Sequence, residues 1–151
     1  MFERTYLFNP FLLMTATDEE LSRIITDLAN RYKHSDLVPD IIDNINLESD
    51  LLTLYGEFIA RYQETCGLKK IEADNRKDKA TYQLRKDWVA TSNEKPPAMT
   101  YFEAQAEDLV KDIRVEQIKA ESMLTRFKKA YDSLQSKQNA LKKQLEAAKY
   151  E

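Results

Sequence analysis

Residues 110–148 read VKDIRVEQIKAESMLTRFKKAYDSLQSKQNALKKQLEAA, and this stretch decides the fold. Starting at Val110, alternating steps of three and four residues reach Val110, Ile113, Gln117, Ala120, Leu124, Phe127, Tyr131, Leu134, Gln138, Leu141, Leu145 and Ala148. This heptad spacing is typical of helices that pack along a shared seam. No proline or glycine interrupts the chain after Pro97, so we expect one long helix from about residue 100 to the C-terminus.

A second long helix is predicted before it. From Glu48 onward, apolar residues such as Leu54 and Phe58 recur at helical spacing, and no proline follows until Pro96. Gly67 is the expected weak point, where the helix can kink or break beside Cys66 while still continuing afterwards. Pro96 and Pro97 then end it, which predicts an antiparallel helical hairpin over residues 48–151 with its turn near 91–99. Thr100 and Glu103 are expected to form a capping box for the returning helix, with Met99 as a hydrophobic staple.

The N-terminal region, residues 1–47, is predicted to form an acidic arm with small helices. Thr17-Asp18-Glu19-Glu20 is a capping box, and it predicts a helix over about 18–33. Residues 34–47 suit a linker with a short helical turn near Pro39. The apolar segment from Phe2 to Met14 is too short for a membrane span and is expected to contact the core or another subunit. The fold class is therefore all-α.

The composition excludes several classes of site. One cysteine and one histidine in 151 residues leave no zinc motif, no catalytic triad and no internal disulfide. The absence of glycine-rich phosphate loops and of a calcium-loop motif argues against nucleotide and EF-hand sites. We therefore expect no metal, no cofactor and no enzymatic activity. Because nothing at the start resembles a secretory signal, we expect a cytoplasmic protein, in a bacterial host cell if it is phage-encoded.

A hairpin of two long helices buries little apolar surface, so we expect a homo-oligomer. The seam supplies the expected subunit contacts, which are Ile113, Leu124, Phe127, Tyr131, Leu134, Leu141 and Leu145. Gln117 and Gln138 are the two polar positions within the seam. They either fix register and subunit number or are simply tolerated near water.

Charge is segregated along the sequence. Residues 1–65 contain 5 basic and 12 acidic side chains, whereas residues 66–151 contain 18 basic and 14 acidic ones. Six basic residues lie along the second part of the predicted C-terminal helix: Arg126, Lys128, Lys129, Lys137, Lys142 and Lys143. The candidate nucleic-acid-binding residues lie on the preceding helix, where cations and aromatic rings are interleaved: Lys69, Lys70, Arg76, Lys77, Lys79, Tyr82, Arg85, Lys86 and Trp88. Such a surface suits single-stranded DNA, although long solvated helices carry lysines as well.

Two stretches resemble the phage recombination mediator proteins of the UvsY type. The first is Lys79-Ala80-Thr81-Tyr82-Gln83-Leu84-Arg85-Lys86-Asp87-Trp88, a basic stretch that ends in an acidic residue and an aromatic one before a turn. The second lies within residues 108–145, where the matching positions are Asp112, Val115, Ile118, Phe127, Leu134, Ser136 and Lys142. The resemblance covers about the last 85 residues. The acidic region before it and the polar tail differ from the family.

This resemblance implies a helical-hairpin protein that forms ring-like oligomers and binds single-stranded DNA without sequence preference. It implies further that the protein helps to load a recombinase onto strands covered by a single-strand-binding protein. Lys79, Arg85 and Lys86 match the positions that would contact phosphates, and Trp88 would stack on bases.

Two functions remain open from the sequence. The first is this accessory role in DNA recombination or repair, with single-stranded DNA, a recombinase and a single-strand-binding protein as partners. The acidic N-terminal half would then dock on a protein. The second is a coiled-coil adaptor, scaffold or inhibitor that acts through protein–protein contacts without nucleic acid.

Overall fold

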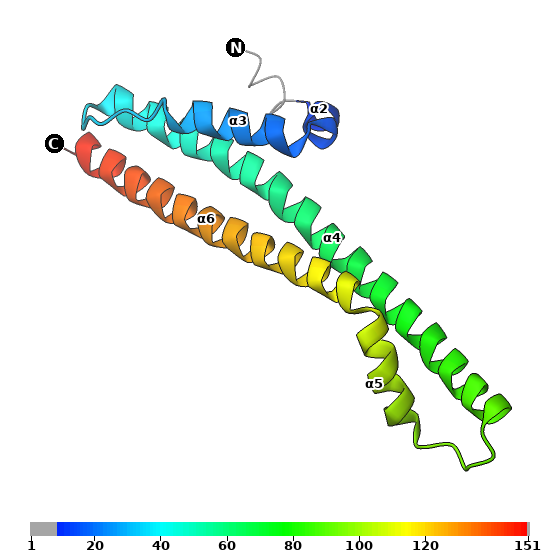
Figure 1. The fold of residues 1–151 in the computed structure, drawn as a ribbon. Helices are drawn as coiled ribbons and strands as arrows, with labels where there is room; N and C mark the ends of the chain where they lie inside the picture. Colours follow the sequence, from blue (N-terminus) through cyan, green and yellow to red (C-terminus); the bar gives the residue numbers. More distant parts are fainter. Residues whose placement is uncertain (1–8, 151) are drawn as a thin grey trace. The chain divides into compact units, whose positions relative to one another are not determined.

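The computed structural model describes residues 9–150, and all regular structure in this range is helical (Figure 1). The elements are α2 (Pro10–Thr15), α3 (Asp18–Ala29), α4 (Val38–Thr91), α5 (Met99–Leu109) and α6 (Lys111–Lys149). The all-α prediction is confirmed, including the two long helices joined by a turn. The part of the Phe2–Met14 segment before Asn9 lies outside the described residues. Within residues 9–150, none of the helices combines the length and the apolar character that crossing a membrane requires.

The chain divides into two compact units. Of the described residues, 9–61 and 124–150 form unit 1, and 62–123 form unit 2. Each unit is a helical pair: unit 1 pairs the first part of α4 with α6 and adds α2 and α3, whereas unit 2 pairs the rest of α4 with α5 and the start of α6. The predicted boundary between residues 47 and 48 falls inside unit 1.

In unit 1, the predicted capping box of α3 is confirmed. The Thr17 hydroxyl accepts a hydrogen bond from the backbone N–H of Glu20 (3.1 Å), and the Glu20 carboxylate accepts one from the N–H of Thr17 (3.3 Å). The helix ends at Ala29, four residues before the predicted end. The buried Asn44 side chain explains this, since it accepts from the Lys33 N–H (2.9 Å) and donates to the Lys33 carbonyl (2.8 Å). Those backbone groups are therefore engaged outside any helix.

The predicted linker over residues 34–47 is wrong beyond its first few residues, because α4 already begins at Val38. Pro39 fits there, since backbone N–H groups in the first turn of a helix have no intrahelical acceptor. Ile41 and Leu47 are buried in unit 1, and this burial extends the helix toward its N-terminus. α4 continues past Gly67 as predicted and is not broken there; a side chain at this position would meet open space.

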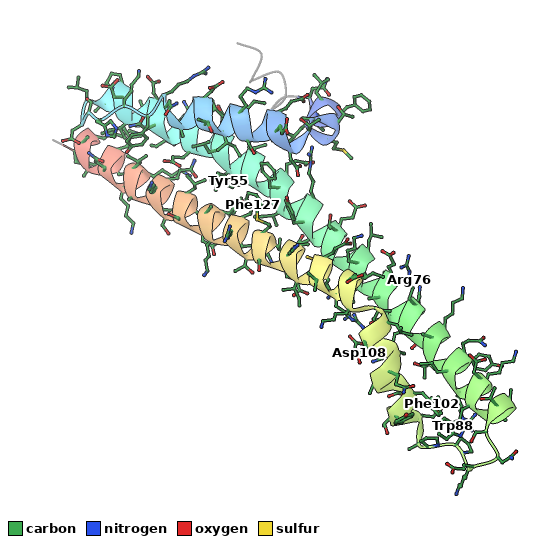
Figure 2. The ribbon with its side chains drawn as sticks, in the orientation of Figure 1. Tyr55, Arg76, Trp88, Phe102, Asp108 and Phe127 are labelled. Carbon is green, nitrogen blue, oxygen red and sulfur yellow. The ribbon has the colours of Figure 1, made fainter. Side chains whose placement is uncertain are left out.

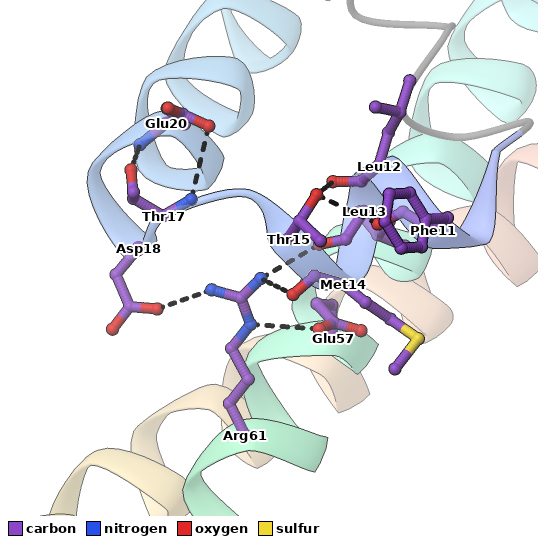
Figure 3. Close-up of polar contacts among 10 residues, drawn as sticks. All are labelled: Phe11, Leu12, Leu13, Met14, Thr15, Thr17, Asp18, Glu20, Glu57 and Arg61. Atoms are coloured by element: carbon purple, nitrogen blue, oxygen red, sulfur yellow. Dashed lines mark hydrogen bonds and ion pairs between the residues drawn. The ribbon is translucent and has the colours of Figure 1, made fainter.

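Arg61 ties α2 and α3 to α4 in unit 1 (Figure 3). Its guanidinium donates to the Leu13 carbonyl (2.9 Å) and to the carboxylates of Asp18 (2.9 Å) and Glu57 (3.0 Å). The short helix α2 itself begins at an Asn9 cap, whose side chain accepts from the Phe11 N–H (3.1 Å). The Arg61 contacts do not follow from the hydrophobic pattern, because they join residues more than 40 positions apart in the sequence.

The heptad seam of α6 packs against α4 inside unit 1. The Phe127 ring stacks on Phe58 with centroids 4.6 Å apart and lies 6.1 Å from Tyr55 (Figure 2). The buried Gln138 donates to the Ile45 carbonyl (3.1 Å) and to the Ser49 hydroxyl. Gln138 is thus a satisfied polar contact between two helices, and it favours one register of α6 on α4.

In unit 2, the returning chain is broken where one continuous helix was predicted. α5 ends at Leu109, Val110 has φ −105° and ψ 12°, and α6 starts at Lys111. Val110 is buried with Ala73 and Ile113, and Arg114 reaches back across the break to Glu107 (2.8 Å). Burial of Val110 and this ion pair together stabilise the irregular residue. The capping box predicted at Thr100 is absent, since the N-cap of α5 is Ala98 without a side-chain hydrogen bond.

Candidate nucleic-acid interface

Four of the nine candidate residues lie close together on an exposed side of α4 in unit 2. Lys79, Tyr82 and Lys86 follow one another at three- and four-residue steps, and Arg85 comes one turn after Tyr82, so all four project from neighbouring positions of the helix. The Tyr82 side chain is 69% exposed. Open surface hollows border it, one lined also by Lys79 and another by Arg85 and Lys86. We call these four residues the Tyr82 cluster.

Among residues 9–150, the cations of the Tyr82 cluster have no carboxylate partner. Lys79, Arg85 and Lys86 are all exposed, and none forms an ion pair with another described residue. Asp87, the acidic residue that follows them, accepts a hydrogen bond from Gln83 (2.8 Å). Three positive charges and one flat ring are therefore presented to solvent within about two helical turns.

Three other candidate cations are engaged within unit 2. Lys69 pairs with Glu116 (2.7 Å), Lys77 with Glu107 (3.3 Å) and Arg76 with Glu72 (3.0 Å). The hydrogen bond between Lys69 and Glu116 raises the pKa of the lysine and lowers the pKa of the glutamate. These side chains already have an anionic partner, so a phosphate would have to compete with it. Lys70 is exposed and without an ion pair to any residue in the range 9–150, but it precedes Lys79 by more than two turns.

Arg114 forms ion pairs with two acidic residues of unit 2. It contacts Asp74 (2.7 Å) and Glu107 (2.8 Å), and its hydrogen bond to Glu107 lowers the pKa of that carboxyl group below its ordinary value. The acidic residues of α5 and early α6 thus neutralise the near side of α4. On the opposite side of α4, Asp78 is an acidic residue that lines the hollows beside Lys79, Tyr82 and Arg85, and none of the cations of the Tyr82 cluster forms an ion pair with it or with another described residue.

Trp88, which the family resemblance assigns to stacking on bases, is half-buried. The indole packs edge-on against Phe102 (centroids 6.2 Å apart) and Tyr101 (6.3 Å) between α4 and α5 of unit 2 (Figure 2). Its Nε1 atom is buried and has no hydrogen-bond partner. Trp88 lies toward the inside of the unit because it projects to the side of α4 on which α5 packs. It therefore supports the fold of this end of unit 2 instead of offering an open ring.

A second group of basic residues is distributed along the exposed sides of α6 in unit 1. Its six basic residues are exposed, and none has an ion pair to another described side chain: Arg126, Lys128, Lys129, Lys137, Lys142 and Lys143. The only acidic residue between Arg126 and Lys143 is Asp132. These cations are visible in the sequence, and the candidate set of nine residues does not include them.

The residues expected to join subunits have partners in their own chain. Ile113 and Leu141 are buried, and Leu124, Phe127, Tyr131, Leu134 and Leu145 are half-buried. Within unit 1, for example, the Tyr131 ring lies close to Gly56, where an added Cβ would be 4.0 Å away from it. An interface between copies is thus not needed to explain why these residues are apolar. Their role in such an interface stays a prediction.

Among residues 9–150, the His, Cys, Asp and Glu side chains form no group of three or more that could hold a metal ion.

Comparisons with protein-family models, with curated proteins and with solved structures find no match to this chain.

Proposed function

We propose that the protein binds single-stranded DNA through the Tyr82 cluster, as a non-enzymatic accessory protein. The observation that carries this proposal is the exposed Tyr82 ring next to three cations without a carboxylate partner. Phosphates of a flexible strand can reach Lys79, Arg85 and Lys86 while an unpaired base stacks on the ring. Neither interaction reads the base sequence, so binding is independent of sequence.

The more specific role that we propose is that of a recombination mediator in the cytoplasm of a bacterial host. It would help a recombinase to replace a single-strand-binding protein on DNA. This role is supported by the coincidence of two independent observations. The basic residues that the family resemblance assigns to phosphates are Lys79, Arg85 and Lys86, and the structure leaves the same three residues without an ionic partner.

The basic residues of α6 offer further phosphate contacts. These six cations can neutralise a nucleic-acid backbone, but without an exposed ring they provide no stacking. In this proposal they add to affinity and to its salt dependence, whereas the Tyr82 cluster distinguishes single strands from duplex.

Salt-dependent binding of a labelled thymidine oligonucleotide tests the proposal. Fluorescence anisotropy at several salt concentrations gives the slope of log affinity against log salt. We expect the triple variant Lys79→Glu, Arg85→Glu and Lys86→Glu to bind weakly and with a shallower slope. The matched control is Lys95→Glu, Lys111→Glu and Lys119→Glu, which changes the net charge equally at exposed positions elsewhere in unit 2.

The control variant should keep most of the affinity. Equal losses in the two variants would show that overall charge, and not the Tyr82 cluster, governs binding. Absence of binding by the unmodified protein at low salt would overturn the proposal.

One observation favours the second candidate function, an adaptor that acts through protein contacts. Leu68, Ile71 and Val89 are exposed on the part of α4 that carries Tyr82. Nucleic acid has no need of aliphatic side chains at these positions, whereas a partner helix does.

A further inference from the structure

The exposed side of α4 in unit 2 carries a second heptad seam. Alternating steps of three and four residues from Leu68 reach Leu68, Ile71, Asn75, Asp78, Tyr82, Arg85 and Val89. All seven are exposed, and the four large apolar ones are 58–69% exposed. The same spacing on α6 marks residues that pack against another helix. This outer seam of α4 has the pattern of a helix contact but no helix of unit 2 covering it.

The outer seam is distinct from the packed side of the same helix. Ala73 is fully buried and contacts Val110 and Ile113, and Thr81 is buried as well. Tyr82 lies at the opposite side of α4 from Ala73, because nine residues correspond to two and a half turns. One side of α4 therefore holds unit 2 together, and the other is available to a partner.

The residues of the outer seam specify what kind of helix can cover it. A parallel copy in register would place Asp78 against Asp78 and Arg85 against Arg85 within the contact, where like charges repel. An antiparallel copy can be placed so that Ile71 meets the second copy's Val89. The same register brings Asn75 to the second copy's Arg85 and Asp78 to the second copy's Tyr82.

Each of these antiparallel pairs is chemically compatible. Ile71 and Val89 bury apolar surface at both ends of the contact, while Asn75 can accept a hydrogen bond from the Arg85 guanidinium and Asp78 one from the Tyr82 hydroxyl. Because the pairing is symmetric, every contact occurs twice. At the flank, Glu72 comes near the second copy's Lys86. The two Lys79 side chains approach each other at the symmetry axis, which opposes association and keeps the dimer weak.

We propose that a second copy of this chain covers the outer seam of α4, antiparallel and with Ile71 beside the second copy's Val89. The contact is isologous, so it closes at a dimer. It uses none of the seam residues of α6. The proposal does not depend on binding of DNA, and it is tested without DNA.

Disulfide trapping tests the register. In a Cys66→Ser background, Ile71→Cys and Val89→Cys are made as separate proteins and oxidised alone or mixed. The two positions are 18 residues apart on one helix, so the antiparallel register keeps identical cysteines of two copies about 27 Å apart. It brings unlike cysteines into reach of a disulfide. We expect covalent dimers chiefly in the mixture, and dimers formed equally well by Ile71→Cys alone would overturn the proposal.

Sedimentation equilibrium of the full chain tests the dimer itself. We expect a reversible monomer–dimer equilibrium, weakened at least about tenfold by Ile71→Glu, because the new carboxylate would be buried against Val89. The matched control is Ile118→Glu, which also places an acid at an exposed isoleucine of unit 2 but on α6. It should leave the equilibrium unchanged, and circular dichroism should show equal helix content in all three proteins. A strict monomer up to several hundred micromolar, or equal losses in both variants, would overturn the proposal.

Discussion

Tyr82 and Trp88 lie six residues apart on α4, yet one ring faces solvent and the other packs against Phe102. The difference follows from their angular positions on the helix, because α5 packs on the side to which Trp88 projects. In the sequence, both are aromatic residues within a basic stretch. The sequence alone does not show which ring is exposed and which is packed. Only the position of the neighbouring helix shows that the Tyr82 ring is exposed, as the proposed stacking requires, and that the Trp88 ring packs within unit 2.

The first prediction concerns Tyr82. Tyr82→Ala should weaken binding of a single-stranded oligonucleotide roughly 5- to 150-fold, because stacking of one base on an aromatic ring contributes about 1–3 kcal/mol. Tyr82→Phe keeps the ring and should bind nearly as well as the unmodified protein. Anisotropy titrations measure both affinities. Equal affinity of all three proteins would exclude stacking on Tyr82.

The second prediction concerns Glu48, a carboxyl group in unit 1 that is 3% exposed and whose Oε2 atom has no hydrogen-bond partner. Burial raises its pKa, although Lys137 acts in the opposite direction. A raised pKa in the folded state means that Glu48 favours folding when it is protonated, and that this contribution is lost as the pH rises through the raised value.

Glu48→Gln removes the charge, so we expect it to melt at a higher temperature than the unmodified protein at pH 7. The difference should shrink below the ordinary glutamate pKa, where both side chains are neutral. Thermal denaturation followed by circular dichroism from pH 4 to pH 8 measures it. Glu103→Gln, at an exposed position of α5, serves as the control. A difference that does not change with pH would contradict the assignment.

At the scale of elements, the helical pairs depend on a few apolar contacts between long helices. In unit 1, the stacked rings of Phe58 and Phe127 join α4 to α6, and the hydrogen bonds of Gln138 select their register. In unit 2, Val110 and Ile113 pack on Ala73. Because each contact surface is narrow, losing one large side chain removes a considerable share of the apolar contact within its unit.

The third prediction is that Phe58→Ala lowers the free energy of unfolding by about 3–5 kcal/mol, as truncation of a buried phenylalanine does. Chemical denaturation measures this change. The exposed Phe11, on α2 in the same unit, provides the control, and Phe11→Ala should change stability by less than about 0.5 kcal/mol. If Phe58→Ala lowers the free energy of unfolding no more than Phe11→Ala does, the contact between α4 and α6 does not contribute the expected stability.

Elements with a local signal could be predicted from the sequence. The capping box at Thr17 and Glu20 places the start of α3 correctly, because donor and acceptor are three residues apart in the chain. The heptad spacing likewise identifies the side of α6 that is packed. These features depend on residues that are close in sequence, so no knowledge of the fold is needed to recognise them.

Features that depend on contacts between elements could not be predicted. The end of α3 depends on Asn44, which binds the backbone of Lys33 from α4. The break at Val110 depends on its burial against Ala73. For the candidate site, charge and aromatic content draw attention to α4, but only packing shows that Lys69 is paired with Glu116. Which cations are paired therefore depends on contacts between helices, which the sequence does not show.

At the scale of the whole molecule, the two proposals concern the same side of α4. Tyr82 and Arg85 belong both to the proposed DNA site and to the proposed contact between copies. A second copy on this side hides them, so DNA and the second copy exclude each other. Dimerisation would then control how much of the DNA site is available, which requires both proposals to hold.

The fourth prediction follows from this overlap. A saturating single-stranded oligonucleotide should shift the monomer–dimer equilibrium toward the monomer, and analytical ultracentrifugation with a labelled oligonucleotide should detect one protein chain per complex at the Tyr82 cluster. The disulfide-trapped dimer described above should bind more weakly than the same protein after reduction. Equal affinity for the oligonucleotide before and after reduction would show that the DNA site and the dimer contact do not overlap.

Photochemical cross-linking tests the DNA proposal most directly. A single-stranded oligonucleotide that contains iodouracil is bound to the full chain and irradiated, and mass spectrometry then identifies the attached residue. The proposed stacking predicts that attachment occurs mainly at Tyr82 and is lost in Tyr82→Ala. Attachment only to residues of α6, or to Trp88, would contradict the central claim that the exposed side of α4 in unit 2 is the functional surface of this protein.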